Sequence, residues 1–158
     1  MQEATSSRVE ARLAELGLTL PGVAKPVAAY LPAVTTGNYV YTSGQLPLIN
    51  GELSVLGKVG AEVSAEEAKA QAQVAALNAL AAIKSQIGDL DRIKRIVKVV
   101  GFVSSDPEFT GQPGVINGAS EFFGEVLGEA GLHSRSAVGV AVLPLNAPVE
   151  VEVIAEFE

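Results

Sequence analysis

The 158-residue sequence contains no cysteine and only one histidine, His133. The absence of cysteine excludes disulfide bonds, thiolate metal ligands and catalysis by a thiol. A single histidine cannot supply the cluster of imidazoles that a histidine-built metal site needs. The acidic residues do not follow the clustered spacing of a Ca²⁺ or Mg²⁺ site. The sequence therefore predicts that no metal is bound.

Positive charge is also scarce. The chain carries 11 lysines and arginines against 18 aspartates and glutamates, which gives a formal net charge of −7. Proteins that bind nucleic acid need a basic surface to neutralise phosphates. The densest basic stretch spans residues 92–98, and its strand-like spacing favours a solvated face over a binding patch. We therefore expect no nucleic-acid partner.

Long apolar segments are missing as well. Five charged residues lie within the first twenty positions, which excludes the apolar core of a signal peptide. The uncharged stretch 26–51 is interrupted by Pro32, Gly37, Gly44 and Pro47, so it does not predict a membrane-spanning helix. We expect a soluble cytoplasmic protein with no membrane partner.

Hydrophobic residues nevertheless make up 48% of the chain, which is enough at this length to bury a substantial core. The length is typical of one domain, and no internal repeat or low-complexity segment divides it. We predict a single domain over residues 1–158, in which an N-terminal helix and linker (1–25) precede the core (26–158).

Three segments have the pattern of helices. Ser64 and Glu67 form a capping box at the start of the longest one, which is predicted to run to Ile87. Its apolar residues recur at intervals of three and four, and many are alanines that allow close approach to a sheet. A second long helix is predicted over 113–130 and a short one over 5–16.

Five segments rich in β-branched and aromatic residues predict strands, over residues 27–34, 38–42, 93–103, 135–143 and 149–157. Between the second and the third, Asn50-Gly51 predicts a tight turn. Two long helices packed on a mixed sheet of five or six strands, with an extra short N-terminal helix, define an α+β fold.

Arg135 stands out because it is charged and begins an otherwise apolar strand. Its planar guanidinium can hold a carboxylate through two hydrogen bonds. Glu150 lies on the polar face of the last strand, and if the last two strands form a hairpin, it lies beside Arg135 and could orient a water or move a proton. Alternatively, Arg135 is a surface residue at a strand entry, and Glu150 belongs to a solvent-facing strand.

Weaker candidates lie elsewhere in the chain. Gly44 ends a strand in an S-G-Q tripeptide, where an exposed backbone N–H could meet an anion, although most such tripeptides are ordinary turns. Tyr30 precedes it. Asn117 interrupts an apolar helical stretch, so its amide either serves a ligand or helps helix packing. His133, taken alone, is more typical of a structural loop.

Taken together, these segments resemble the RidA/YjgF family from about Val27 to Phe157. The sequence GNYVYTSGQLP (37–47) is similar to the early strand motif of this family. The order and spacing of Arg135, Pro144 and Glu150 are similar to its C-terminal signature. The N-terminal helix, together with VVGFV at 99–103, resembles a longer subgroup of the family.

The resemblance implies a chorismate-mutase-like fold and a homotrimer with a site in each cleft between subunits. It implies that Arg135 grips a substrate carboxylate and that Glu150 positions water. Tyr30, Gly44 and Asn117 would line the site. Ala137 stands where many members have a cysteine, and would contribute through its backbone.

The reaction that the resemblance implies is hydrolytic deamination. A small anionic 2-aminoacrylate-like enamine or imine would give a 2-keto acid and ammonia, with no metal or organic cofactor. The main alternative is a non-catalytic ligand sensor that uses the same clefts. An endoribonuclease, an activity attributed to some relatives, is disfavoured by the negative net charge.

Overall fold

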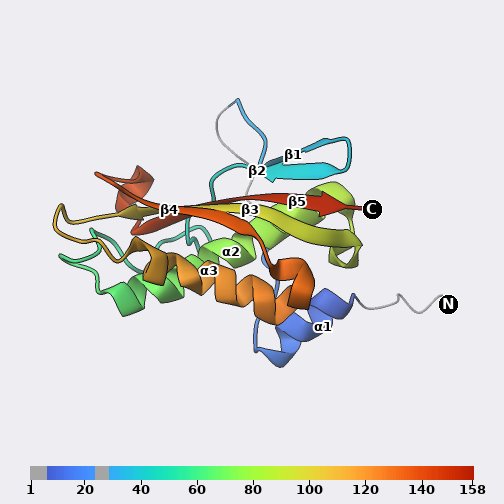
Figure 1. The fold of residues 1–158 in the computed structure, drawn as a ribbon, viewed down its shortest axis with the longest axis horizontal. Coiled ribbons are helices and arrows are strands. Elements are labelled where there is room, and N and C mark those ends of the chain that lie inside the picture. Colours follow the sequence, from blue (N-terminus) through green and yellow to red (C-terminus); the bar gives the residue numbers. More distant parts are fainter. Residues whose placement is uncertain (1–6, 24–28) are drawn as a thin grey trace.

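The computed structural model describes residues 7–23 and 29–158, and its centre is a mixed five-stranded sheet (Figure 1). The strands lie in the order β1-β2-β5-β3-β4. Their bounds are Ala33–Thr36 (β1), Tyr39–Thr42 (β2), Ile93–Ser104 (β3), Ser134–Val140 (β4) and Val149–Phe157 (β5). β3 and β4 are parallel, whereas the other neighbouring pairs are antiparallel. The predicted mixed sheet is confirmed.

Two long helices, α2 (Ala65–Ile87) and α3 (Gln112–Leu127), lie side by side against one face of the sheet (Figure 1). The predicted capping box is present, because Ser64 Oγ accepts from the Glu67 N–H and the Glu67 carboxylate accepts from the Ser64 N–H. The short helix α1 (Arg8–Glu15) packs against α3 on the side away from the sheet. Among the described residues, no helix is long and apolar enough to cross a membrane.

Alternation along β5 distinguishes the two faces of the sheet. Val149, Val151 and Val153 are buried beneath the helices, whereas Glu150 and Glu152 point to the opposite face. No helix covers that opposite face within the described part of the chain (Figure 1). We call it the open face.

The last two strands do not form the hairpin that would have placed Arg135 beside Glu150. β3 lies between β4 and β5. α3 forms the crossover between the parallel strands β3 and β4, as a parallel pair requires. β4 also ends at Val140, short of the predicted Leu143, because β3 ends opposite it at Ser104 and offers no further partner. Arg135 and Glu150 are therefore not on adjacent strands.

Other predicted boundaries shift for local reasons. α3 ends at Leu127, earlier than predicted, because Gly128 adopts a φ of 63° and a 3-10 turn follows. β1 begins at Ala33, directly after Pro32, which has no N–H to donate. The predicted strand start at residue 27 and the predicted helix start at residue 5 lie outside the described residues.

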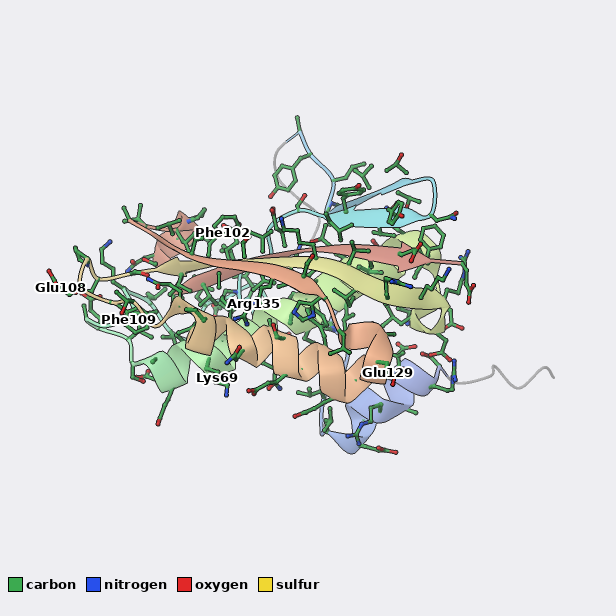
Figure 2. The ribbon with its side chains drawn as sticks, viewed as in Figure 1. Lys69, Phe102, Glu108, Phe109, Glu129 and Arg135 are labelled. Carbon is green, nitrogen blue, oxygen red and sulfur yellow. The ribbon has the colours of Figure 1, made fainter. Side chains whose placement is uncertain are left out.

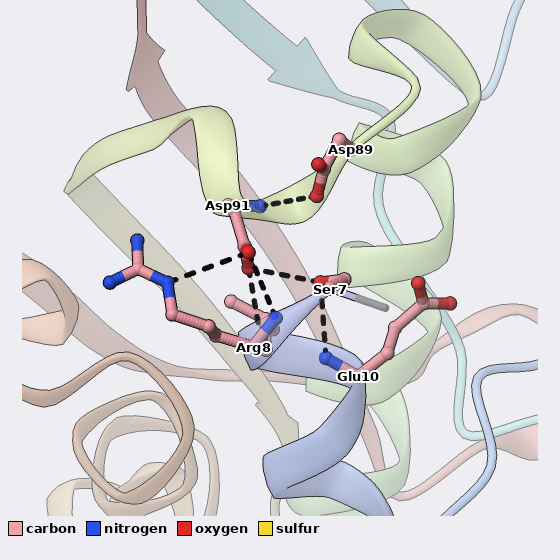
Figure 3. A network of polar contacts seen from close by, with 6 residues as sticks. Ser7, Arg8, Glu10, Asp89 and Asp91 are labelled. Carbon is pink, nitrogen blue, oxygen red and sulfur yellow. Dashed lines mark hydrogen bonds and ion pairs between the residues drawn. The ribbon is translucent and has the colours of Figure 1, made fainter. Parts of the chain in front are cut away.

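The N-terminus of helix α1 contacts one carboxylate, Asp91, in the turn between α2 and β3 (Figure 3). Asp91 Oδ1 accepts from Ser7 Oγ at 2.9 Å and from the Val9 N–H at 3.0 Å, and Oδ2 accepts from the Arg8 N–H at 2.8 Å. Burial opposes ionisation of Asp91, but the hydrogen bonds from the Arg8 and Val9 amides and the Ser7 hydroxyl, together with the charge of Arg8, lower its pKa. The ionised carboxylate thus satisfies amides that a helix N-terminus leaves unpaired.

We expect Asp91→Ala to lower the free energy of unfolding by about 1–3 kcal/mol, because the first amides of α1 lose their acceptor. Urea unfolding at neutral pH measures this loss, and amide hydrogen exchange should accelerate in residues 8–16 more than in α2. In the wild type, the same contribution should fade as the pH falls through the lowered pKa of Asp91, because a carboxyl with a depressed pKa stabilises only while ionised. Unchanged protection of α1 in the variant would contradict this role.

Candidate functional site

Arg135 lies on the edge strand β4, and its side chain points toward α3. Its Nη1 donates to Asn117 Oδ1 at 2.7 Å and to Ser120 Oγ at 3.2 Å. These two acceptors are three residues apart on α3, so both face β4. In the ladder, Arg135 pairs with Val99 of β3, which is fully buried on the helix side. Arg135 therefore lies between the sheet and the helix.

One edge of the guanidinium remains available to a ligand. Nη1 carries two hydrogens, and Asn117 and Ser120 accept both. Within the described residues, no hydrogen bond or ion pair involves Nε or Nη2 of Arg135. These two nitrogens form a parallel pair of donors that matches the two oxygens of a carboxylate. Arg135 can thus hold an anion without giving up its internal contacts.

His133, which was predicted to be a structural loop residue, is linked to Arg135 through Ser120. Ser120 Oγ lies 2.8 Å from His133 Nε2, and His133 Nδ1 lies 2.6 Å from the Gly131 carbonyl oxygen. Ser120 was missed altogether. The signals that could have revealed both are the helical spacing from Asn117 to Ser120 and the alternation that places residues 133 and 135 on the same side of the chain.

Ala137 lies two residues beyond Arg135 and on the same side of β4, opposite Gly101 of β3. It is half-buried and packs against the core. Since β4 is the last strand of the sheet, its outer backbone edge has no strand beside it in the described part of the chain. We call Arg135, Asn117 and Ala137 the arginine group.

Tyr30, Gly44 and Glu150 form a second group, which we call the glutamate group. A Cβ at position 44 would collide with the Glu150 carboxylate, so a larger residue there would force the Glu150 side chain to move. The Gly44 N–H has no hydrogen-bond partner among the described residues. Ser43 Oγ donates to the Leu31 carbonyl at 2.6 Å, which ties the segment that carries Tyr30 to the segment that carries Gly44. The side chain of Tyr30 is exposed.

The surroundings of Glu150 disfavour the ionised form of its carboxyl group. Burial raises the pKa of Glu150, and the carboxylate of Glu152 raises it further because both point to the open face of β5. Among the candidate residues, Glu150 is thus the carboxyl whose pKa its surroundings raise.

The arginine group and the glutamate group do not meet within one chain. Glu150 pairs with Phe102, which stands on the open face, whereas Arg135 lies between the sheet and α3 (Figure 2). Strand β3 separates them laterally, and their pairing partners on β3 are three residues apart. With strands about 4.8 Å apart and a rise of about 3.3 Å per residue, their Cα atoms are roughly 14 Å apart. Within a single chain, Glu150 therefore does not lie beside Arg135, because the hairpin on which that placement depended is absent.

Comparison with known proteins identifies the class to which this fold and these residues belong. The sequence model of the family described as "YjgF/chorismate_mutase-like, putative endoribonuclease" matches residues 10–157. The chain therefore belongs to the YjgF family, and the predicted chorismate-mutase-like α+β fold is confirmed.

The chain is also similar to individual proteins over most of its length. The chain is 43% identical to Protein TCP17 of Trypanosoma cruzi over 158 residues, which cover 99% of each chain. It is 34% identical over 130 residues to 2-iminobutanoate/2-iminopropanoate deaminase of Escherichia coli K12, covering 82% of this chain and 88% of the relative. The crystal structure of Atu1372 from Agrobacterium tumefaciens, a protein of unknown function, is similar with a TM-score of 0.90 at 47% identity, covering 96% of this chain and 93% of that chain.

We expect Glu150→Gln to unfold at a higher denaturant concentration than the wild type at neutral pH. Because folding raises the pKa of Glu150, its protonated form is favoured in the folded state. That contribution is present in acid and is lost as the pH rises through the raised pKa. The difference in stability should therefore be absent below about pH 4, the ordinary range of glutamate, and grow toward neutral pH.

Urea unfolding of both proteins between acid and neutral pH tests this expectation. Glu152→Gln offers a second test, because it removes the neighbouring charge that helps to raise the pKa of Glu150. The stabilisation that Glu150→Gln brings at neutral pH should therefore be smaller when Glu152→Gln is already present than in the wild-type chain. A difference in stability that does not change with pH would show that Glu150 is not perturbed.

Proposed function

We propose that this protein hydrolyses small 2-imino acids, or the 2-aminoacrylate-like enamines from which they form, to 2-keto acids and ammonia. The observation that carries the proposal is the available Nε and Nη2 edge of Arg135. A small substrate with one carboxylate needs one such two-point grip. The 34% identity to a 2-iminobutanoate/2-iminopropanoate deaminase supports the same reaction type.

We also propose that the site is completed between copies of the chain in a homotrimer, as the family resemblance implies. Neither group of residues forms a complete site alone, because the sheet lies between them. Exposed apolar side chains on the open face, among them Val34, Tyr39, Tyr41 and Val138, favour a partner that covers this face. A cleft between the arginine group of one subunit and the glutamate group of the next would bring both to one ligand.

In such a cleft, each group has a distinct task. Arg135 holds the carboxylate and so fixes the position of the imine carbon. The Gly44 N–H is available to an oxygen of the ligand, and Glu150 orients a water toward that carbon. Water adds to the imine carbon: as the C–O bond forms, Glu150 takes one proton from the water and passes it to the nitrogen, which gives a carbinolamine. Glu150 then takes the hydroxyl proton and passes it to the same nitrogen as the C–N bond breaks, which releases the 2-keto acid and ammonia. Positioning of this kind can lower a barrier by about 7 kcal/mol in favourable cases.

The net charge argues against the endoribonuclease activity that the family description names. A chain with a net charge of −7 would repel the phosphates of RNA. A ligand sensor uses the same carboxylate grip and differs from the proposed enzyme only in turnover. Hydrolysis of the imine is therefore the measurement that separates the two functions.

We expect Arg135→Ala to slow imine hydrolysis by roughly 30-fold or more, because loss of a two-point charged contact in a partly buried site costs about 2–5 kcal/mol. Arg135→Lys keeps the charge without the paired donors and should also lose much of the activity. The imine is generated in situ by an amino-acid dehydratase, and its disappearance is followed with each variant.

Thermal melting and the mass in solution of each Arg135 variant serve as controls for folding and assembly. A full rate with Arg135→Ala would show that the arginine is not part of the site. If the wild type works no faster than buffer while an active relative does, the ligand sensor is the better description.

We expect co-expressed Arg135→Ala and Glu150→Gln chains to recover activity that neither variant has alone. In a randomly mixed trimer, about a quarter of the interfaces would join an intact Arg135 to an intact Glu150 from the neighbour. The rate should therefore approach about a quarter of the wild-type rate. Sedimentation equilibrium checks the trimer, and a mixture no more active than its components would place the site within one chain.

A further inference from the structure

Ser120 and His133 form a chain of hydrogen bonds that ends on Arg135. The Gly131 carbonyl oxygen can only accept, so His133 Nδ1, 2.6 Å away, carries a hydrogen. In the neutral ring, Nε2 is then an acceptor, and the Ser120 hydroxyl donates to it at 2.8 Å. The hydroxyl has one hydrogen, so its lone pairs are left for Arg135 Nη1 at 3.2 Å. Each hydrogen bond thus fixes the direction of the next.

We propose that Ser120 and His133 are positioning residues that fix the plane of the Arg135 guanidinium, so that its Nε and Nη2 meet the carboxylate of a 2-imino acid in one orientation. The proposal rests on the proposed function and names residues that act through Arg135 without touching the substrate.

The geometry of the guanidinium explains why two acceptors are needed. Both hydrogens of Nη1 lie in the guanidinium plane. Asn117 Oδ1 alone fixes one N–H direction and leaves the plane free to turn about it, whereas Ser120 Oγ provides the second point that defines the plane. The orientation of Nε and Nη2 follows, because they belong to the same rigid group.

His133 in turn holds Ser120 in the rotamer that this arrangement requires. Without an acceptor at Nε2, the Ser120 hydroxyl could rotate and donate to a backbone carbonyl of α3 instead. The imidazole is itself fixed, because it packs edge-on against the ring of Phe123 at 6.1 Å between centroids and donates to the Gly131 carbonyl. Phe123 is fully buried, so this support belongs to the rigid core.

Four variants test the proposal with 2-oxobutanoate as a stable carboxylate probe. Ser120→Ala removes the second acceptor, and Ser120→Thr keeps a hydroxyl. His133→Phe keeps the aromatic contact with Phe123 but cannot accept from Ser120. Ser85→Ala is the matched control, because it removes another helical serine whose hydroxyl only donates to the Ala82 carbonyl within α2.

Two readouts are measured on the folded, full-length protein. Isothermal titration gives the Kd for 2-oxobutanoate, and ¹⁵N NMR of the Arg135 side chain without ligand gives the rate of rotation of its guanidinium. We expect roughly tenfold weaker binding in Ser120→Ala and His133→Phe, comparable to the loss of one hydrogen bond to a charged group. Their guanidinium should rotate faster, whereas Ser120→Thr and Ser85→Ala should stay close to the wild type.

The outcomes separate this proposal from the proposed function. If the wild type binds 2-oxobutanoate and folded Ser120→Ala binds it equally well, the positioning role is wrong while the site assignment stands. If Ser120→Ala binds normally but no longer hydrolyses the imine, Ser120 takes part in the chemistry, which also overturns the positioning role. If the wild type binds no carboxylate, the proposed function fails, and the NMR comparison still decides whether Ser120 and His133 order Arg135.

Discussion

The packing of α2 and α3 against one face of the sheet, with the other face left open, determines where each candidate residue can act. Val149, Val151 and Val153 are buried beneath the helices, so Glu150 and Glu152 must project to the open face. On β4, the Arg135 side chain lies on the helix side of the sheet and points toward α3. A one-residue slip of β4 against β3 would send Arg135 to the open face and away from Asn117 and Ser120.

The side chains that accept hydrogen bonds from Arg135 are neutral, and this affects how Arg135 can bind an anionic ligand. Burying part of a guanidinium costs free energy unless its donors are satisfied, and Asn117 and Ser120 satisfy two of them without neutralising the charge. The ion pairs of the described residues involve other arginines and lysines, such as Arg12 with Glu15 and Lys84 with Glu10. An internal carboxylate at Arg135 would compete with a substrate carboxylate for the same donors. Neutral acceptors orient the group and leave its charge for the ligand.

Local features of this fold follow from short stretches of sequence. The Ser64 capping box, the turn at Asn50-Gly51 with φ values of 53° and 81°, and the alternation of β5 all agree with prediction. Each depends on neighbours within a few residues, so the spacing of residue types is sufficient evidence. The end of β4 and the start of β1 were less predictable. β4 ends where its partner strand ends, and β1 begins directly after a proline, which has no N–H to donate.

The sequence by itself determined the fold class, the family and the identity of Arg135 and Glu150 as candidates, because these depend on periodicity and on the spacing of motifs along the chain. Only the tertiary structure decided which strands are neighbours, and thereby that Arg135 and Glu150 lie on opposite faces of the sheet. It alone brought Ser120 and His133 to Arg135, through the crossover that lays α3 beside β4. Contacts between segments far apart in sequence depend on the order of the strands, which no local pattern in this chain specified.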